Sequence, residues 1–262
     1  MDGRERGSIA SPAGPVVGLA AGRGWLVVEK PCGLSIHNAP GSDLCSVVLA
    51  ALKQGWLPAA GDARSRVHAV HRLDRDTSGV VLLALDPQTL AWFGGQFAAR
   101  TVHKRYLAMI HGRLDGSTAG ATWCVWDQPL TASAAGRKDP MGRGSRLPCA
   151  TRWRMLDQGR RYTLIECEPL TGRKHQIRRH AKLAGHPVVG DRRYGSSRSR
   201  DYLVRHHRFD RLGLHAHSLG IRLRGESQNT VFRSAGLPPA MAQLLTFDRC
   251  TMGSRCSDGG SE

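Results

Sequence analysis

The sequence predicts a mixed α+β fold, and three observations lead to this class. Segments with strand-like and helix-like patterns interleave, but without the regular 30-residue rhythm of a doubly wound βαβ protein. No internal repeat is present. The composition, 40% hydrophobic and 23% charged, is that of a globular chain with a packed core. We expect one domain over residues 23–248, with flexible tails at 1–22, which is rich in Gly, Ser and Pro, and at 249–262, which is rich in Gly and Ser.

In the first half of the chain, apolar runs and turn residues set the expected elements. Pro31 and Gly33 stop a short apolar run, which is typical of a strand entering a turn. Asp86 and Pro87 form an N-cap followed by proline at the first helical position. We expect strands at 25–30, 79–85 and 102–112 and helices at 43–56 and 87–99.

In the second half, a segment rich in Gly, Ser, Ala and Pro at 115–148 predicts loops and short strands. Gly185 and Pro187 favour the end of a helix just before them. We expect strands at 150–156, 161–168 and 212–223, a helix at 175–183 and a basic loop with a short helix at 192–211.

The charge distribution indicates a polyanionic partner. The chain carries 38 Lys and Arg against 21 Asp and Glu, a net charge of +17. Residues 137–211 hold 20 of the basic and 7 of the acidic side chains, so the excess is concentrated there. Nucleic acid is favoured, because Lys and Arg contacts to phosphates release counterions. An anionic membrane surface or a generic basic surface would also carry such charge, although no apolar run of about 18 residues could span a bilayer.

Cysteine usage and the first residues indicate a cytoplasmic protein. The seven cysteines are odd in number and form no Cys-x-x-Cys pair, so neither a disulfide framework nor a zinc ribbon is predicted. Residues 1–24 contain Asp2 and Glu5 and lack the sustained apolar segment of a signal peptide.

The densest motif is HRLDRDTSG at 71–79, just before a strand with a continuous apolar run. Asp74 and Asp76 are two residues apart in a segment rich in turn residues, so they need not share a site, and an acid–base pair is not implied. A structural role, with Asp76, Thr77 and Ser78 satisfying backbone groups of a turn, suits these residue types well.

A second motif, TGRKHQIRRH at 171–180, opens a helix with positive charge and free N–H groups, which suits an anion. Ile177 and Ala181 have the spacing of a buried stripe, and Arg178 falls on another face. A solvated basic helix explains the pattern equally well. His175 and His180 are five residues apart, so the sequence predicts no metal site and no metal cofactor.

Together these blocks resemble the RluA-type RNA pseudouridine synthases. The resemblance rests on these two motifs and on EKPCGLSIH at 29–37, HKRYLAMIHG at 103–112, GHPVVGDRRYG at 185–195 and LHA at 214–216, in the family's order. It covers residues 25–223, about three quarters of the chain. The family fold that it implies is a mixed, mostly antiparallel sheet with flanking helices and a central RNA-binding cleft, and residues 23–248 would be the catalytic domain.

The resemblance implies an isomerase that converts uridine in RNA to pseudouridine without a cofactor. It assigns Asp74 as the essential aspartate, Arg173 as its ion-pair partner and Tyr106 as the active-site tyrosine, which would stack on the uracil. A carboxylate can act as a nucleophile or assist proton removal, so attack on the base, attack on the sugar and a glycal route all stay open.

The resemblance also implies RNA contacts. Arg72 would enter the RNA and hold the target nucleotide out of its stack, because the reacting atoms are inaccessible in a stacked helix. Leu214 would line the uracil pocket. The remaining RNA-binding residues expected from the motifs are His71, Lys104, Lys174, His175, Gln176 and Arg178.

Two departures and one absence shape the expected target recognition. Arg179 stands where the family usually has a small apolar residue, so we expect the basic face of the helix to extend further, and Glu29 replaces an asparagine. Nothing before residue 25 resembles an S4 RNA-binding domain, so loops 113–148 and 192–211 should choose the target. We expect a monomer that binds tRNA or rRNA and requires no protein partner. The alternative is an RNA-binding chaperone that keeps the fold.

Overall fold

The computed structural model describes residues 7–60, 66–114, 122–133 and 135–250. The chain divides into two compact units. The first comprises the described part of Met1–Tyr106 together with Leu214–Gly236, and the second comprises Leu107–Gly213 and the described residues from Leu237 onward. Each unit therefore consists of two separate stretches of the chain.

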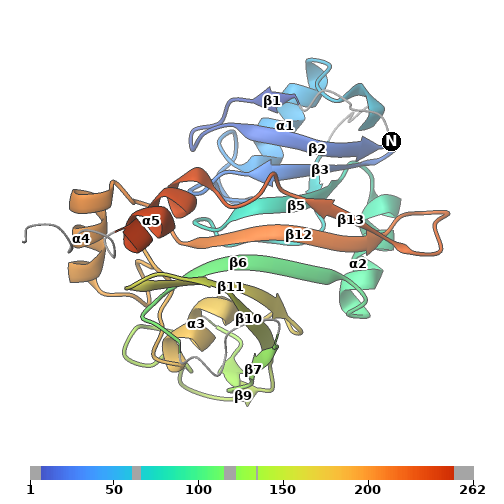
Figure 1. The fold of residues 1–262 in the computed structure, drawn as a ribbon. Coiled ribbons are helices and arrows are strands. Elements are labelled where there is room, and N and C mark those ends of the chain that lie inside the picture. Colours follow the sequence, from blue (N-terminus) through green and yellow to red (C-terminus); the bar gives the residue numbers. More distant parts are fainter. Residues whose placement is uncertain (1–6, 61–65, 115–121, 134, 251–262) are drawn as a thin grey trace, which may run out of the picture. The chain divides into compact units, whose positions relative to one another are not determined.

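The first unit is built on strands that lie side by side in the order β1-β2-β3-β5-β12 (Figure 1). β5 and β12 are parallel, whereas β1·β2, β2·β3, β3·β5 and β12·β13 are antiparallel. The elements are β1 (Ser8–Ile9), β2 (Val16–Gly22), β3 (Trp25–Lys30), α1 (Leu44–Lys53), η1 (Pro58–Ala60), β4 (His68–Ala69), β5 (Ser78–Ala84), α2 (Pro87–Ala98), β12 (Leu214–Arg222) and β13 (Asn229–Arg233).

Both faces of this sheet are buried, which explains the continuous apolar run in β5. Val81 and Leu83 pack into a core cluster with Leu44 and Val48 of α1. Val80 and Leu82, which point to the other face of the strand, lie in a second cluster with Phe93 of α2. Alternate residues of one strand therefore supply two hydrophobic layers.

The second unit contains the strand order β6-β11-β10-β7, with β10 antiparallel to both of its neighbours. β6 (His103–His111) passes from the first unit to the second between Tyr106 and Leu107. Helix α3 packs against β10 and β11, and α5 packs against β11. The other elements are β7 (Cys124–Trp126), β8 (Leu130–Thr131), β9 (Arg146–Leu147), β10 (Thr151–Gln158), β11 (Tyr162–Pro169), α3 (Gln176–Leu183), α4 (Ser197–His207) and α5 (Pro239–Cys250).

The mixed, mostly antiparallel sheet with flanking helices is confirmed. The expected helix cap is present as well, because the side chain of Asp86 accepts a hydrogen bond from the Thr89 N–H at 2.7 Å. Among the described residues, no helix has the length and apolar character needed to cross a membrane. In the same part of the chain, no three His, Cys, Asp or Glu side chains are grouped to hold a metal ion.

The structure corrects the N-terminal boundary that composition suggested. Residues 16–22, expected within a flexible tail, form β2, whose residues pair with β3 from Val17↔Glu29 to Gly22↔Trp25. The order comes from this ladder and from burial of Val16, neither of which composition can show. The C-terminal tail expected at 249–262 begins inside α5, and residues 251–262 lie outside the described part.

Candidate active site

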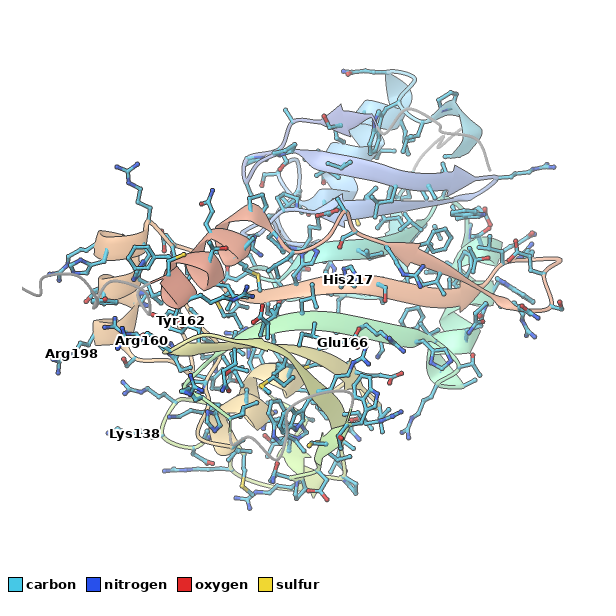
Figure 2. All side chains as sticks on the ribbon, in the orientation of Figure 1. Lys138, Arg160, Tyr162, Glu166, Arg198 and His217 are labelled. Carbon is cyan, nitrogen blue, oxygen red and sulfur yellow. The ribbon has the colours of Figure 1, made fainter. Side chains whose placement is uncertain are left out.

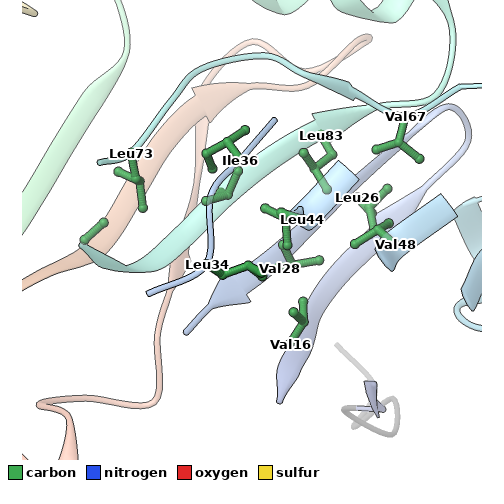
Figure 3. Packing of buried hydrophobic residues seen from close by; sticks show 12 residues of the cluster. Val16, Leu26, Val28, Leu34, Ile36, Leu44, Val48, Val67, Leu73 and Leu83 are labelled. Atoms are coloured by element: carbon green, nitrogen blue, oxygen red, sulfur yellow. The ribbon is translucent and has the colours of Figure 1, made fainter. Parts of the chain in front are cut away.

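The loop at residues 71–77, which we call the aspartate loop, joins β4 to β5 in the first unit. Leu73 is 6% exposed and packs in the core cluster beside Ile36 (Figure 3). Its neighbours differ, because Arg72 is exposed and Asp74 is half-buried. The buried leucine therefore fixes the main chain between the two residues expected to touch RNA.

Lys30, at the end of β3, holds the main chain of the aspartate loop through hydrogen bonds. It is fully buried, and its Nζ donates to the carbonyl oxygens of Pro31 at 3.0 Å, Leu34 at 2.7 Å and Arg75 at 2.9 Å. The Gly33 N–H also donates to the Arg75 carbonyl, at 3.0 Å. A buried ammonium needs several acceptors, and here they tie the residue after Asp74 to the turn that follows β3.

The end of the motif is fixed by β12. The parallel pairing places Ser78 opposite His215, and the Ser78 Oγ lies 2.8 Å from the His215 Nδ1. The other ring nitrogen of His215 lies 2.8 Å from the Ser234 hydroxyl. Ser78 thus has a side-chain partner on another strand, while the Thr77 N–H makes the expected turn bond to the Asp74 carbonyl at 3.1 Å.

Gly79 is required by this pairing. Its φ is +116°, and a Cβ at this position would lie 2.2 Å from the Ala216 carbonyl oxygen. Any other residue would collide with the main chain of β12. The glycine therefore lets the motif and the LHA block approach closely.

Tyr106 lies on β6, half-buried against the core cluster. Burial and the negative charge of Asp74 both raise the pKa of its phenol. The first unit thus places the Asp74 carboxylate within electrostatic range of the Tyr106 phenol, and both effects favour the protonated, neutral phenol.

His71 and Lys104, both expected to bind RNA, lie near each other, and the structure gives His71 a different role. Its Nε2 accepts a hydrogen bond from the Leu82 N–H at 3.0 Å, and its ring stacks on Phe97. Burial and the charge of Lys104 lower the pKa of His71 to about 3. The imidazole is therefore a neutral acceptor that ties the aspartate loop to β5.

Arg72 borders two pockets in the first unit. One has a volume of about 700 Å³ and lies between the aspartate loop and residues 31–42. The other, of about 530 Å³, is lined by residues 67–72 with Cys45 and Leu90. The exposed guanidinium thus stands between two concave surfaces. Leu214, expected to line a uracil pocket, is 4% exposed.

In the second unit, Gln176 fixes the turn that precedes α3. Its Oε1 accepts from the Thr171 hydroxyl at 2.7 Å and from the Arg173 N–H at 3.0 Å. Its Nε2 donates to the Ala150 carbonyl at 2.9 Å and to the Thr151 hydroxyl at 3.0 Å. Gln176 is buried and its amide is saturated by these bonds, so in this structure it holds the turn and is not exposed for the expected RNA contact.

Two further motif residues bind the block at 185–195. Arg178 and Asp191 form a buried ion pair with two hydrogen bonds, at 2.7 and 2.9 Å. The His175 Nδ1 lies 2.9 Å from the Tyr194 hydroxyl. Arg178 is therefore not exposed for the expected RNA contact, because its guanidinium forms a bidentate pair inside the unit.

Arg179 is also buried, which corrects the expected extension of the basic face. It is 0% exposed, and its guanidinium donates to main-chain oxygens of residues 131–141. The exposed cation at this end of α3 is Lys174.

Arg173 is half-buried, and its Nε is buried without a hydrogen-bond partner among the described residues. Asp74 belongs to the first unit and Arg173 to the second, so the ion pair between them stays a prediction.

The sequence motifs did not predict the roles of Lys30 and His215, although these residues lie in the blocks EKPCGLSIH and LHA.

Comparison with known proteins agrees with these motifs. Residues 24–183 match the model of a family described as RNA pseudouridylate synthase. The chain belongs to this family. The pseudouridylate synthase motifs at 71–79 and 171–180 both lie within the matched residues.

Curated pseudouridine synthases align with much of the chain. Ribosomal large subunit pseudouridine synthase C of Vibrio vulnificus is 34% identical over 197 residues, 73% of this chain and 56% of that protein. The chain thus spans little more than half the length of that relative. A tRNA pseudouridine synthase C of Salmonella typhi is 33% identical over 237 residues, 85% of this chain and 86% of that protein.

A solved structure shows the same fold. The human RNA Pseudouridylate Synthase Domain Containing 4 superposes with a TM-score of 0.67 at 24% identity, covering 87% of this chain and 91% of that one.

Proposed function

We propose that this chain isomerises uridine to pseudouridine in structured RNA, either tRNA or ribosomal RNA, with Asp74 as the essential carboxylate. The observation that carries the proposal is the aspartate loop, which holds the motif carboxylate beside the protonated phenol of Tyr106. The names of the aligned relatives, which include ribosomal and tRNA synthases, support both substrate classes.

The reaction rearranges one nucleotide. The N1–C1′ bond breaks, the uracil turns in place, a C5–C1′ bond forms, C5 loses its proton and N1 gains one. Atoms and oxidation state are unchanged, so side chains can supply the needed chemistry. Asp74 would assist bond cleavage, and Tyr106 would lie against the uracil with its hydroxyl near the transferred proton.

Two arginines complete the proposed site. Arg173 would pair with Asp74 and orient the carboxylate, in line with its buried Nε, which has no hydrogen-bond partner in the described part of the chain. Arg72 would hold the target nucleotide out of its stack. Its side chain is exposed on the aspartate loop, and the next residue, Leu73, is fixed in the core.

Pseudouridine mapping tests the proposal. The purified chain is incubated with unmodified tRNA and large-subunit ribosomal RNA transcripts, and pseudouridines are located by chemical labelling and primer extension. We expect Asp74→Asn to lower turnover by about 10³-fold or more, because the reacting group is lost. Asp76→Asn is the matched control, since it changes the other carboxylate of the same loop, and we expect it to stay within about threefold of wild type.

The outcomes separate the alternatives. If the wild-type chain installs no pseudouridine in either RNA, the proposal is wrong. RNA binding without product would then favour a chaperone that keeps the fold. Equal losses in the Asp74 and Asp76 variants would show that the loop, rather than the Asp74 carboxylate, is what matters.

A further inference from the structure

A buried arginine organises one basic segment of the second unit. Arg179 donates from its Nε to the Pro140 carbonyl at 2.6 Å and from its Nη2 to the Met141 carbonyl at 2.6 Å. Its Nη1 donates to the Thr131 carbonyl at 2.9 Å. Its further acceptors are the Thr131 hydroxyl at 2.9 Å and the Ser133 and Lys174 carbonyls, both at 3.3 Å.

Almost all of these acceptors lie in residues 130–133 and 135–147, which we call the β8–β9 hairpin. Its ends pair as Leu130↔Leu147 and Thr131↔Arg146. Arg193 adds a second anchor, with its Nε donating to the Ala135 carbonyl at 2.6 Å. Two arginines from outside the hairpin therefore hold its described main chain, which excludes residue 134.

The charged side chains that the hairpin exposes are all basic. All four of its cations are exposed, and the Lys138 side chain extends away from the ribbon (Figure 2). The hairpin contains one acidic residue, Asp139, whose carboxylate accepts from the Gly142 N–H at 3.0 Å. The exposed cations are Arg137, Lys138, Arg143 and Arg146.

Burying a guanidinium costs several kcal/mol unless acceptors replace its water. A small apolar side chain at position 179 would carry no such desolvation cost. The presence of the arginine is therefore explained by the main chain of the hairpin, which it holds. Fixing a loop before binding lowers the entropy that binding loses. A basic loop held in this way suits a polyanion of defined shape.

We propose that the β8–β9 hairpin is a preformed contact surface for the phosphates of the substrate RNA, and that Arg179 is the positioning residue that presents it. This inference rests on the proposed function. The hairpin contains no aromatic residue on which a base could stack, so phosphate contacts are favoured over base reading. The bond from Arg179 to the Lys174 carbonyl also connects the hairpin to the turn that carries Arg173.

Binding assays with two matched variants test the surface. Fluorescent, unmodified tRNA transcripts are titrated at several KCl concentrations. The hairpin variant is Arg137→Ala/Lys138→Ala/Arg143→Ala/Arg146→Ala. The control removes four exposed cations of the first unit, Arg23→Ala/Lys53→Ala/Arg224→Ala/Arg233→Ala.

Both variants lower the net charge by four, so a difference between them reports position. We expect the hairpin variant to bind about 10- to 100-fold more weakly at about 0.1 M salt, and its log–log salt slope to fall by about 3. The control should stay within about threefold of wild type. Equal losses in the two variants would overturn the inference.

Arg179→Met, with Arg179→Lys as the conservative variant, tests the positioning role. The hairpin holds four trypsin sites, so we expect Arg179→Met to be cleaved there at least about tenfold faster, with Arg179→Lys in between. KM for RNA should rise while kcat changes little. Adding Arg179→Met to the hairpin variant should cause no further loss of affinity, because both act on one surface. Additive losses, or an unchanged cleavage rate, would contradict the role.

The two proposals fail in distinguishable ways. Binding needs no turnover, so Asp74→Asn should bind RNA like wild type. A wild-type chain that makes no pseudouridine would defeat the proposed function. An active chain whose hairpin and control variants bind equally well would defeat only this inference.

Discussion

The HRLDRDTSG motif of the first unit and the TGRKHQIRRH motif of the second unit both depend on buried cations, but in different ways. Lys30 reaches the aspartate loop from a neighbouring strand and donates to its main chain. In the second unit the cations belong to the helix itself, where Arg178 pairs with a carboxylate and Arg179 with carbonyls. The difference teaches that motif cations divide into buried ones with partners inside the protein and exposed ones, such as Arg72 and Lys174.

The glycines of the two motifs give the sharpest test of this comparison. Gly79 has φ +116° and no room for a Cβ, whereas Gly172 has open space around it. We expect Gly79→Ala to lower the free energy of unfolding by more than about 4 kcal/mol or to prevent folding, through overlap with β12 and backbone strain. Gly172→Ala should change it by less than about 0.5 kcal/mol. Urea unfolding measures both, and similar costs would break the comparison.

Replacing Lys30 probes the next largest effect. Lys30→Met leaves three carbonyl oxygens without this donor, and we expect the free energy of unfolding to fall by about 2–4 kcal/mol, with strongly reduced pseudouridine formation. Lys53→Met, at an exposed position on α1, is the control and should be near neutral. Unchanged activity in a folded Lys30→Met protein would show that the aspartate loop keeps its shape without the ammonium.

The pH dependence of stability tests the role of His71. Its folded pKa of about 3 lies below the ordinary value of 6.5, so the unfolded chain binds the proton more tightly. Stability from this group is complete above about pH 6.5 and is lost as the pH falls towards 3, by at most about 1.4 kcal/mol per pH unit. His71→Gln, which keeps an acceptor, should show a shallower loss between pH 6.5 and 4 in urea unfolding. Parallel curves for the two proteins would contradict the buried, neutral assignment.

Sequence patterns correctly predicted the elements whose start or burial depends on residues close together in the sequence. The continuous apolar run of β5 and the Asp86–Pro87 start of α2 are visible in the sequence and present in the structure. β2 was missed because its Gly- and Ala-rich residues acquire strand structure from pairing with β3. Helix α5 carries the helical spacing of Met241, Leu244 and Leu245, a signal that was available but not interpreted.

For the site, the sequence located the motifs but not the direction of each side chain. It could not distinguish Lys174, which is exposed, from Arg178 and Arg179, which are buried. The burial of these arginines depends on partners far along the chain, such as Asp191 and the hairpin carbonyls. Single-residue charge contains no information about such partners.

The hydrogen bonds of His215 have a consequence for synthesis on the ribosome. The first stretch of the first unit ends at Tyr106, and its second stretch begins at Leu214. Its sheet therefore contains contacts between residues that are far apart in the sequence. The side chain of Ser78 can form its hydrogen bond only once His215 has been synthesised, and His215 can form its second bond only once Ser234 has been synthesised. Because non-local contacts form late, the start of β5, directly after the aspartate loop, acquires these neighbours in a nascent chain only after residues 214–234 have emerged. A translation product that ends before residue 214 would therefore lack these bonds at the end of the motif.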